Sequence, residues 1–533
     1  MEENPILKGF NPDPSIVRVG NDYFIATSTF EWYPGVQIHH SRDLINWYVL
    51  AQPLNRASLL DLRGNPDSCG IWAPCLSHSK GKFYLIYTDV KRHDGSFKDA
   101  HNYLTTCDTI DGKWSDPVYL NSSGFDPSLF HDGDKKWLLN MVWDHRPGIN
   151  PFGGIQLQEF CSESQKLTGP VRNIFKGTKM GFTEAAHLYF RNGYYYLLTA
   201  EGGTEYDHCM TLARSKNIHG PYEVDPLGHF LTSKEDQNLE LQRSGHGDIV
   251  ETPNGEIYVV HLASRPLTGI KRSPMGRETA IQGAYWNTDG WLRLNQGNNK
   301  PALTLPSVSI AEHPWPEIAA KDDFNMPMLP NHYQWLRTPF PENFYSLKER
   351  PGYLRLKGKQ SIGNWFEQSL IARRQQSANF RAETLVEFEP DHYQQMAGLV
   401  CYYNAHKYHY LYISKDTKNG KHLAIISCLG DTSTTSSYAL YDSKTGTNGV
   451  TIPENKKIYL RAVITGAQLL FSWSIDSINW HQLPVELDYS LISDEAGKGA
   501  GNSFTGAFIG MCCQDISGAD KHADFGYFEY LES

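Results

Sequence analysis

The chain has 533 residues, of which 40% are hydrophobic and 13% are aromatic, and its formal net charge is −10. This length is too great for one ordinary hydrophobic core and predicts two domains. The negative charge and the absence of a run of Lys or Arg argue against nucleic-acid binding, which needs a clustered basic face. A small neutral or hydrophilic ligand is the better expectation.

We expect a soluble, cytoplasmic protein with no membrane partner. The first ten residues, MEENPILKGF, contain no basic segment followed by an apolar one, and no later stretch holds 18 uninterrupted apolar residues. The nine cysteines are an odd count, are scattered along the chain and include no CxxC pair. This usage predicts buried, reduced thiols rather than a disulfide framework or a zinc site.

A hairpin pattern occurs five times in the first half of the chain. Each copy runs from a polar or small residue through an apolar pair and a Gly/Asn/Asp turn into an aromatic-rich strand. The copies start 53 to 62 residues apart and read DPSIVRVGNDYFIATST, APCLSHSKGKFYLIYTD, DPSLFHDGDKKWLLNMV, EAAHLYFRNGYYYLLTA and HGDIVETPNGEIYVVHLA. Repetition at this spacing, with further short strands between copies, is typical of a five-bladed β-propeller. A large β-sandwich is the alternative.

Three of the five copies begin with an acid. The first strand of each propeller blade lines the central channel, and the equivalent first positions are Asp13, Ala73, Asp126, Glu184 and His246. A single Asp before a Pro is a common turn former. Three acids in one register instead predict a shared pocket, because like charges gathered there separate their pKa values, as acid–base catalysis requires.

Two carboxylates of different pKa beside aromatic side chains suit hydrolysis of a glycosidic bond. One acid protonates the leaving oxygen while the other activates water. Phe30, in TSTFEWYPG, and Trp72, in CGIWAP, adjoin the channel-facing ends of strands, so we predict that they contact a sugar ring. Glu201 and Glu205, in TAEGGTEYDH, follow the fourth hairpin; we interpret them as loop carboxylates, with a place at the mouth of the same pocket as the alternative.

The second half of the chain predicts a β-sandwich. The propeller pattern ends near GWLRLNQGNNKPALTLPS, and the Pro-rich segment AEHPWPEIAAKDD has the composition of a linker. Short β runs then alternate with Gly, Asn and Asp turns. We therefore expect a catalytic propeller over residues 1–306, a linker over 307–321 and a β-sandwich over 322–533. Taken alone, this sandwich could be a carbohydrate-binding module.

Several motifs resemble those of the β-xylosidases of glycoside hydrolase family 43. In chain order they are GFNPDPSIVRVGNDYFIATSTFEWYPGVQIHHSRDLINW, GFDPSLF, GFTEAAHLY, SGHGDIVET and MGRETAIQ, and the resemblance spans nearly the whole chain. It implies an all-β fold, with a five-bladed propeller followed by a β-sandwich, and an inverting mechanism. It also implies that Asp13 is the general base, that Glu184 is the general acid, and that Asp126 tunes the pKa and position of Glu184.

The resemblance further implies the residues that bind the substrate. Arg277, in MGRETAIQ, would bind substrate hydroxyls, and Phe30 and Trp72 would wall the sugar pocket. His246 would lie at the centre of the channel. Phe504, in AGNSFTGAF, would close one side of the pocket from a loop of the sandwich, so that only a chain end could enter.

These inferences predict an exo-1,4-β-xylosidase that releases xylose from the non-reducing ends of β-1,4-xylo-oligosaccharides, with α-L-arabinofuranosidase activity as a side reaction. An α-L-arabinofuranosidase or arabinanase is the alternative enzyme, and a glycan-binding propeller is the non-enzymatic alternative. His246 could contact a hydrated calcium ion, as in some family members, but a lone His is more often a hydrogen-bonded core residue. We therefore predict no obligatory cofactor and no protein-bound metal. The resemblance suggests a homotetramer.

Overall fold

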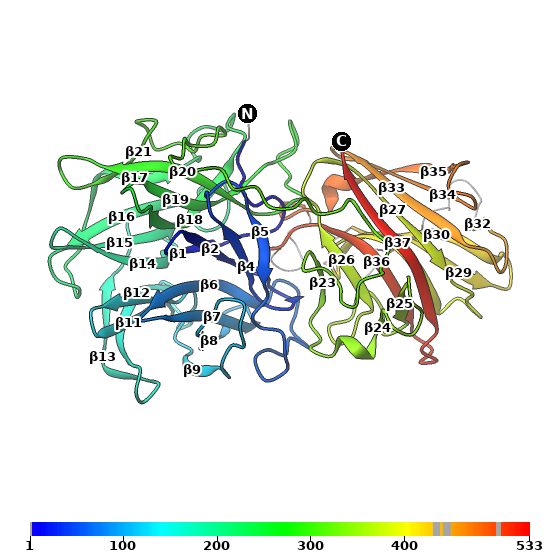
Figure 1. Cartoon of the computed structure of the whole chain (residues 1–533), viewed down its shortest axis with the longest axis horizontal. Coiled ribbons are helices and arrows are strands. Elements are labelled where there is room, and N and C mark those ends of the chain that lie inside the picture. The colour runs from blue at the N-terminus through cyan, green and yellow to red at the C-terminus, as the bar shows by residue number, and fades with distance from the viewer. Residues whose placement is uncertain (1–2, 430–437, 441–448, 497–502) are drawn as a thin grey trace.

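The computed structural model describes residues 3–429, 438–440, 449–496 and 503–533, which form two all-β halves side by side (Figure 1). The helices in these ranges are two single turns of 3-10 helix, η1 (Pro341–Asn343) and η2 (Tyr489–Leu491). In the part of the chain that the structure describes, no helix has the length and apolar character needed to cross a bilayer.

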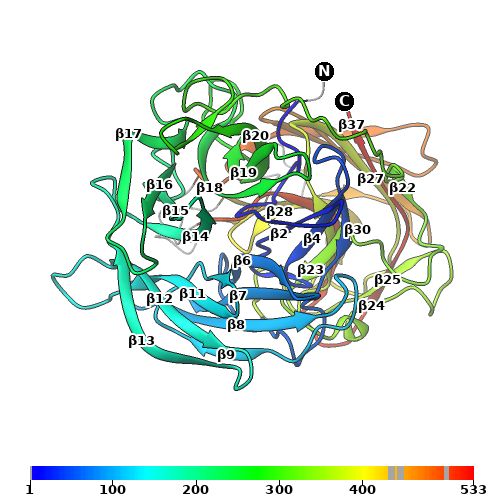
Figure 2. The same cartoon turned by 60° about the vertical axis from the view of Figure 1, so that its left-hand side comes forward.

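The first half is a ring of five antiparallel four-stranded sheets, which confirms the predicted five-bladed propeller (Figure 2). β1 contacts both β6 and β18, so the first blade bridges the second and the fifth and closes the ring. The blades consist of β1 (Ser15–Val19), β2 (Asp22–Thr27), β4 (Gln37–Ser41) and β5 (Tyr48–Ala51); β6 (Gly70–Ser79), β7 (Lys82–Arg92), β8 (Asp99–Cys107) and β9 (Val118–Asn121); β10 (Ser128–Asp132), β11 (Lys135–Trp143), β12 (Phe152–Cys161) and β13 (Lys166–Phe175); β14 (Glu184–Arg191), β15 (Tyr194–Glu201), β16 (Cys209–Ser215) and β17 (Glu223–Thr232); and β18 (Gln242–Glu251), β19 (Ile257–Ser264), β20 (Glu278–Trp286) and β21 (Leu292–Leu294).

The second half is the predicted β-sandwich, made of two antiparallel sheets. One sheet has the order β24-β25-β37-β27-β33-β34-β35, with β22 paired to β37; the other has the order β3-β23-β26-β36-β28-β29-β30-β31, with β32 paired to β30. Their strands are β3 (Trp32–Tyr33), β22 (Lys321–Asp322), β23 (Tyr333–Leu336), β24 (Tyr345–Ser346), β25 (Leu354–Lys357), β26 (Leu370–Arg374), β27 (Asn379–Glu387), β28 (Gln395–Asn404), β29 (Lys407–Asp416), β30 (Gly420–Leu429), β31 (Tyr438–Leu440), β32 (Val450–Thr451), β33 (Ile458–Thr465), β34 (Gln468–Ser474), β35 (His481–Asp488), β36 (Phe508–Asp515) and β37 (His522–Glu532).

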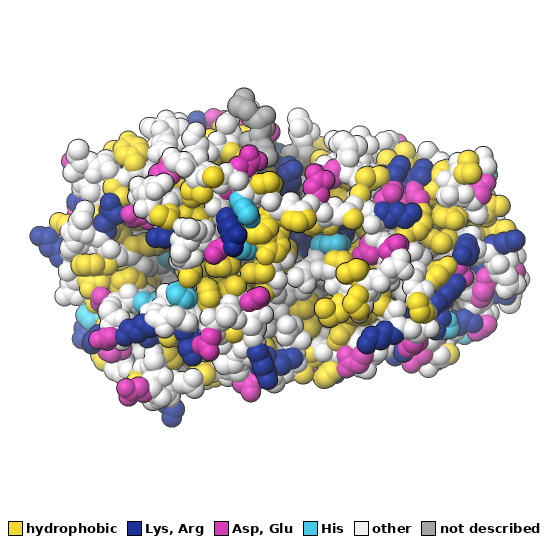
Figure 3. Space-filling model, viewed as in Figure 1, with side chains coloured by type: hydrophobic (Ala, Val, Ile, Leu, Met, Phe, Trp, Pro, Cys, Tyr) yellow, Lys and Arg dark blue, Asp and Glu magenta, His cyan; other side chains and the backbone are white. Residues whose placement is uncertain are grey.

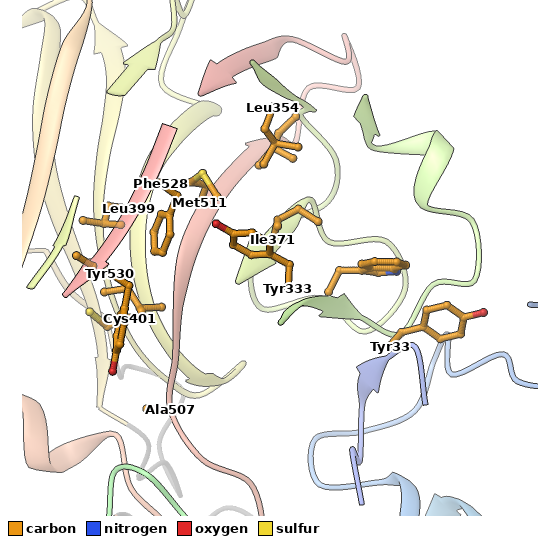
Figure 4. Close-up of a cluster of buried hydrophobic side chains, with 14 of the residues drawn as sticks. Tyr33, Tyr333, Leu354, Ile371, Leu399, Cys401, Ala507, Met511, Phe528 and Tyr530 are labelled. Atoms are coloured by element: carbon orange, nitrogen blue, oxygen red, sulfur yellow. The ribbon is translucent and has the colours of Figure 1, made fainter. Parts of the chain in front are cut away.

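The hydrophobic pattern explains how these strands pack. In β33, IYLRAVIT, buried and partly exposed residues alternate along the strand, as a sheet with one covered face requires. The core between the two sheets includes Leu399, Met511 and Phe528, and Tyr33 of the propeller segment lies beside this cluster (Figure 4). The apolar core of the sandwich therefore continues into the first blade.

A strand exchange ties the two halves together. β3 lies between the second and third strands of the first blade, yet it pairs with β23, with Trp335 opposite Tyr33. The ring of Trp32 stacks on Phe508 of β36 at a centroid distance of 3.6 Å. The last propeller strand ends at Leu294, and the next strand, β22 of the sandwich, begins at Lys321. The domain limits at residues 306 and 322 stay predictions; residue 306 falls in the connection between β21 and β22, and residue 322 falls within β22.

Charges of both signs are interspersed on the face shown in Figure 3.

Eight of the nine cysteines are buried, and Cys161 is partly exposed.

Candidate active site

A pocket of about 280 Å³ lies at the propeller channel, where a loop of the sandwich reaches it. The structure brings all eight residues singled out from the sequence into its wall; their chemical roles stay predictions. They are Asp13, Phe30, Trp72, Asp126, Glu184, His246, Arg277 and Phe504.

The inner strands present the three acids through irregular backbone. Asp13 and Asp126 each lie two residues before an inner strand, with left-handed φ values of 57° and 53° that Asp tolerates better than most residues. Glu184 is the first residue of β14, at a register shift in its pairing with β15. His246 lies at a similar irregularity in β18. Such bulges re-aim side chains, which explains why one register delivers these groups to one pocket.

Asp13 is held as a carboxylate. Arg277 Nη1 donates to Asp13 Oδ1 at 3.0 Å, and Ser28 Oγ donates to Oδ2 at 2.6 Å. His246 Nδ1 lies 3.6 Å from Oδ1. Burial alone would raise the pKa of Asp13, but Arg277, His246 and Ser28 together outweigh it and lower the pKa below its usual value.

Glu184 and Asp126 have the opposite tendency. Burial first, and then the negative charge of Asp13, raise the pKa of Glu184 to about 8, against the opposing effects of Arg277 and Lys98. Burial, Glu184 and Asp13 hold the pKa of Asp126 well above its usual value. The pocket therefore combines an acid of lowered pKa, Asp13, with two acids of raised pKa, of which Glu184 remains largely protonated at neutral pH.

Asp126 also contacts the backbone next to Glu184. Its carboxyl accepts a hydrogen bond from the N–H of Ala185, the residue that follows Glu184. Two residues further along, Ser128 Oγ donates to the carbonyl of Ala186 at 2.5 Å. The third blade thus fixes the segment of the fourth blade that carries Glu184.

Glu201 fixes the same segment from its other side. It is the last residue of β15 and is fully buried, so its interpretation as a loop carboxylate is wrong. Its two oxygens accept hydrogen bonds from Thr178 N and Oγ1, from Thr183 Oγ1 and from Thr211 Oγ1, at 2.7 to 2.8 Å. Because Thr183 directly precedes Glu184, these bonds restrict the position of the acid.

The sandwich reaches the pocket through Phe504. Arg277 is 2% exposed, and its Nη2 donates to the Phe504 carbonyl at 2.7 Å while its Nη1 bonds Asp13. Gly276 has a φ of +69°, and a Cβ there would lie 2.1 Å from the Thr505 carbonyl. The glycine of MGRETAIQ therefore allows the propeller backbone and the sandwich loop to approach each other and to place Arg277.

Three aromatic side chains form one wall. The ring centroids of Phe30 and Trp72 are 5.9 Å apart, and the ring of Phe504 lies 6.4 Å from Phe30 and 6.0 Å from Trp72. Ser68 ties two of them together, because its carbonyl accepts from Trp72 Nε1 at 2.9 Å and its hydroxyl from Phe504 N at 3.1 Å. The wall is thus built from both halves of the molecule.

Further lining residues were not predicted from the sequence. Lys98 Nζ lies 4.3 Å from the ring centroid of Trp143. Phe152 lies 5.5 Å from Trp143, and Phe182, which is 52% exposed, lies 4.9 Å from Phe152. These aromatic rings extend the pocket outward. Phe182 had a local signal, because it lies within GFTEAAHLY two residues before Glu184, and so had Phe125, which lines the pocket and directly precedes Asp126 in GFDPSLF.

The surroundings of His246 offer little to a metal ion. Across the described ranges, no three His, Cys, Asp or Glu side chains are grouped as metal ligands. Burial lowers the pKa of His246 to about 4, so its ring is neutral at neutral pH. The neighbouring Asp13 oxygens already accept bonds from Arg277 and Ser28. A calcium ion here would take most of its ligands from water.

Two family models match the chain, one over the propeller half and one over the sandwich half. Residues 2–292 match the model of the glycosyl hydrolases family 43. Residues 321–531 match the model of the β-xylosidase C-terminal concanavalin A-like domain.

Individual relatives resemble the chain over its full length. It is 51% identical to xylosidase/arabinosidase 43B of Humicola insolens, with 99% of this chain and 97% of the relative covered. It is 49% identical to a β-xylosidase of Bacillus subtilis strain 168, with 99% of both chains covered. The crystal structure of xylan β-1,4-xylosidase from Bacillus halodurans C-125 matches all of both chains, with a TM-score of 0.96 and 50% identity. The chain therefore belongs to glycosyl hydrolase family 43.

Proposed function

We propose that this protein is an exo-acting, inverting glycoside hydrolase that releases xylose from the non-reducing ends of β-1,4-xylo-oligosaccharides. The observation that carries the proposal is the split in proton affinity within one pocket: the pKa of Asp13 is lowered and that of Glu184 is raised to about 8. Family membership and the printed names of the relatives from B. subtilis and B. halodurans support the substrate.

The proposed reaction uses each acid in the state that its surroundings favour. Asp13, as a carboxylate, takes a proton from water while the water oxygen bonds to the anomeric carbon. Glu184 gives its proton to the glycosidic oxygen, whose bond to that carbon breaks. Inversion requires the two carboxyl groups to be about 6.5–9.5 Å apart, with room for the water between them.

The other polar groups position these two. Asp126 holds the backbone after Glu184 through Ala185, and its raised pKa disfavours a second negative charge in the pocket. Arg277 binds Asp13 and Phe504 together, and its guanidinium is placed to bind sugar hydroxyls as well.

An exo action follows from the closed wall. Phe30, Trp72 and Phe504 contact one another on one side of the pocket, which leaves room for a terminal sugar ring. The row of Trp143, Phe152 and Phe182 leads outward, and we assign it to the leaving part of the substrate. A longer chain would then enter by its end only.

α-L-Arabinofuranosidase activity is the second candidate, because the relative from Humicola insolens is named a xylosidase/arabinosidase. A purely glycan-binding propeller is disfavoured, because such a module needs no set of three buried acids with divided proton affinities. Comparison of kcat/KM for xylobiose, xylan and arabino-oligosaccharides ranks these activities.

The decisive test is the order in which products appear from xylotetraose. We expect xylose and xylotriose first, with no early xylobiose, since an exo enzyme removes one terminal unit at a time. Early xylobiose in the absence of xylose would reject the exo assignment. A homotetramer in the cytoplasm remains part of the proposal; sedimentation as a monomer at working concentration would reject the tetramer.

A further inference from the structure

A second cavity lies between the two halves and shares no lining residue with the active-site pocket. It has a volume of about 200 Å³. The propeller contributes the segment around Asn11 and the strands β4 and β5, and the sandwich contributes the end of β26. Lys8, which is an exposed residue, also lines the cavity.

Two consecutive arginines dominate the chemistry of this cavity. Arg373 and Arg374, the last residues of β26, are 7% and 6% exposed. Arg374 Nε donates to the Phe10 carbonyl at 2.5 Å, and Arg373 Nη2 donates to Gln376 Oε1 at 3.0 Å. Each guanidinium keeps a buried nitrogen without a hydrogen-bond partner, Nη2 of Arg374 and Nε of Arg373.

A third unsatisfied donor lies in the same wall. Gln37 of β4 is 1% exposed, and its Nε2 has no hydrogen-bond partner. Buried polar groups are nearly always paired, by protein, by water or by a ligand. Three side chains that line one cavity, two of them arginines, each carry an unpaired donor nitrogen, which favours an acceptor bound among them.

The charge of the wall points to an anionic acceptor. Among the described residues, no Asp or Glu lines this cavity. Burial lowers the pKa of Arg374 to about 9, so this group remains a cation at neutral pH. Burial, together with Arg374, lowers the pKa of His39 to about 3, so this ring of the wall is neutral. A buried cation without a counter-ion is costly, and a bound anion would offset that cost.

We propose that this interdomain cavity binds a small oxyanion between Arg373 and Arg374, with Gln37 and Lys8 as further donors. The planar guanidinium fork fits the paired oxygens of a phosphate or a carboxylate. The cavity volume also admits an anion larger than inorganic phosphate, such as a small polycarboxylate.

Such an anion would brace the interface behind the active site. Gly9 has a φ of +75°, and a Cβ there would lie 2.3 Å from the Gln375 carbonyl, so the propeller segment already meets the end of β26 closely. Phe10, which accepts from Arg374, lies 5.7 Å from the ring of Phe30 in the sugar-pocket wall. Binding should therefore raise the melting temperature of the whole chain.

The test is a thermal-shift titration of the full chain with sodium phosphate at constant ionic strength, balanced with sodium chloride. We expect the melting temperature to rise with phosphate and to saturate, as binding to one site requires. Arg373→Met should abolish the saturable rise. As a matched control, Arg191→Met removes a guanidinium that pairs with Glu251 on the propeller surface and should retain it. An equal, unsaturating rise in all three proteins would be a general salt effect and would overturn the proposal.

A second variant and a direct observation keep the test decisive if Arg373→Met does not fold. Gln37→Leu removes one donor while leaving both arginines, and it should weaken phosphate binding without abolishing it. Crystals soaked in selenate should show anomalous density between Arg373 and Arg374. Parallel titrations with citrate distinguish a carboxylate ligand from phosphate, because the preferred anion saturates the rise in melting temperature at the lower concentration. Saturation by neither anion, or density confined to other sites, would refute the site.

Discussion

The two cavities between the propeller and the sandwich have opposite chemical character. The active-site pocket gathers Asp13, Asp126 and Glu184 and places Arg277 against one of them. The interdomain cavity gathers Arg373 and Arg374, with no acid in its described wall. In the active-site pocket, the protein itself supplies a counter-charge to the acids, through Arg277. In the interdomain cavity, the two arginines have no counter-charge among the described lining residues.

The difference shows what Arg277 does for the acids. Burial raises the pKa of all three carboxyls, yet only the one bonded to Arg277 ends below its usual value. The negative charge of Asp13 then helps to keep a proton on Glu184. Arg277, together with His246 and Ser28, therefore separates one acid of lowered pKa from two acids of raised pKa.

The largest expected effect comes from removing the ionised acid. Asp13→Ala should lower kcat/KM by about 10⁴-fold on both xylobiose and nitrophenyl xyloside, because water must be activated whichever group leaves. Steady-state kinetics on the two substrates, with circular dichroism to confirm folding, provide the measurement. Full activity on the aryl substrate would contradict the role of Asp13 as base.

Removing Glu184 should separate the two substrates. Glu184→Ala should cost about 10³-fold on xylobiose, whose leaving group needs a proton, and much less on nitrophenyl xyloside, whose leaving group does not. The ratio of the two losses is the quantity to measure. Equal losses on both substrates would show that Glu184 is not the general acid.

Asp126 should have an intermediate effect. Asp126→Asn keeps the size of the side chain and can still accept from Ala185 N, but it removes the titratable group beside Glu184. We expect a loss of about 10²-fold on xylobiose and a smaller loss on the aryl substrate, as for a residue that acts through the acid. A loss as large as that of Asp13→Ala on both substrates would instead place Asp126 in direct contact with the reacting atoms.

Lys98 offers the smallest and most specific change. Its positive charge favours the ionised form of Glu184 and so lowers the pKa of that acid. Glu184 must be protonated to act, so activity should be present below its pKa of about 8 and be lost as the pH rises through it. Lys98→Met should move this basic limb of kcat/KM to higher pH. As a control, Lys166→Met, which replaces an exposed lysine of β13, should leave the basic limb where it is. A shift toward lower pH would contradict the assignment.

The sequence allowed the acids to be predicted because each lies in a repeated hairpin. A repeat fixes the register, so Asp13, Asp126 and Glu184 could be aligned without the structure. Lys98 and Phe152 lie at or next to connections between blade strands, which follow no common length or pattern, and no register points to them. The buried role of Glu201 was not predicted either, because it depends on three threonines that only the folded chain brings together.

Contacts between the two halves were beyond sequence reasoning. β3 is only two residues long, and its partner β23 lies about 300 residues further along the chain. Arg277 and Phe504 were placed in the pocket through the family resemblance, since no local pattern relates a propeller loop to a sandwich loop. The interdomain cavity had no sequence signal, because two adjacent arginines in a strand are ordinarily surface residues.

The central claim, that Asp13 activates water while Glu184 protonates the leaving group, is tested most directly by the anomer released first. A proton NMR spectrum taken within the first turnovers of a β-xyloside should show α-xylose, because water attacks the face opposite the leaving group. Initial release of β-xylose would mean that a covalent intermediate forms and would contradict this account.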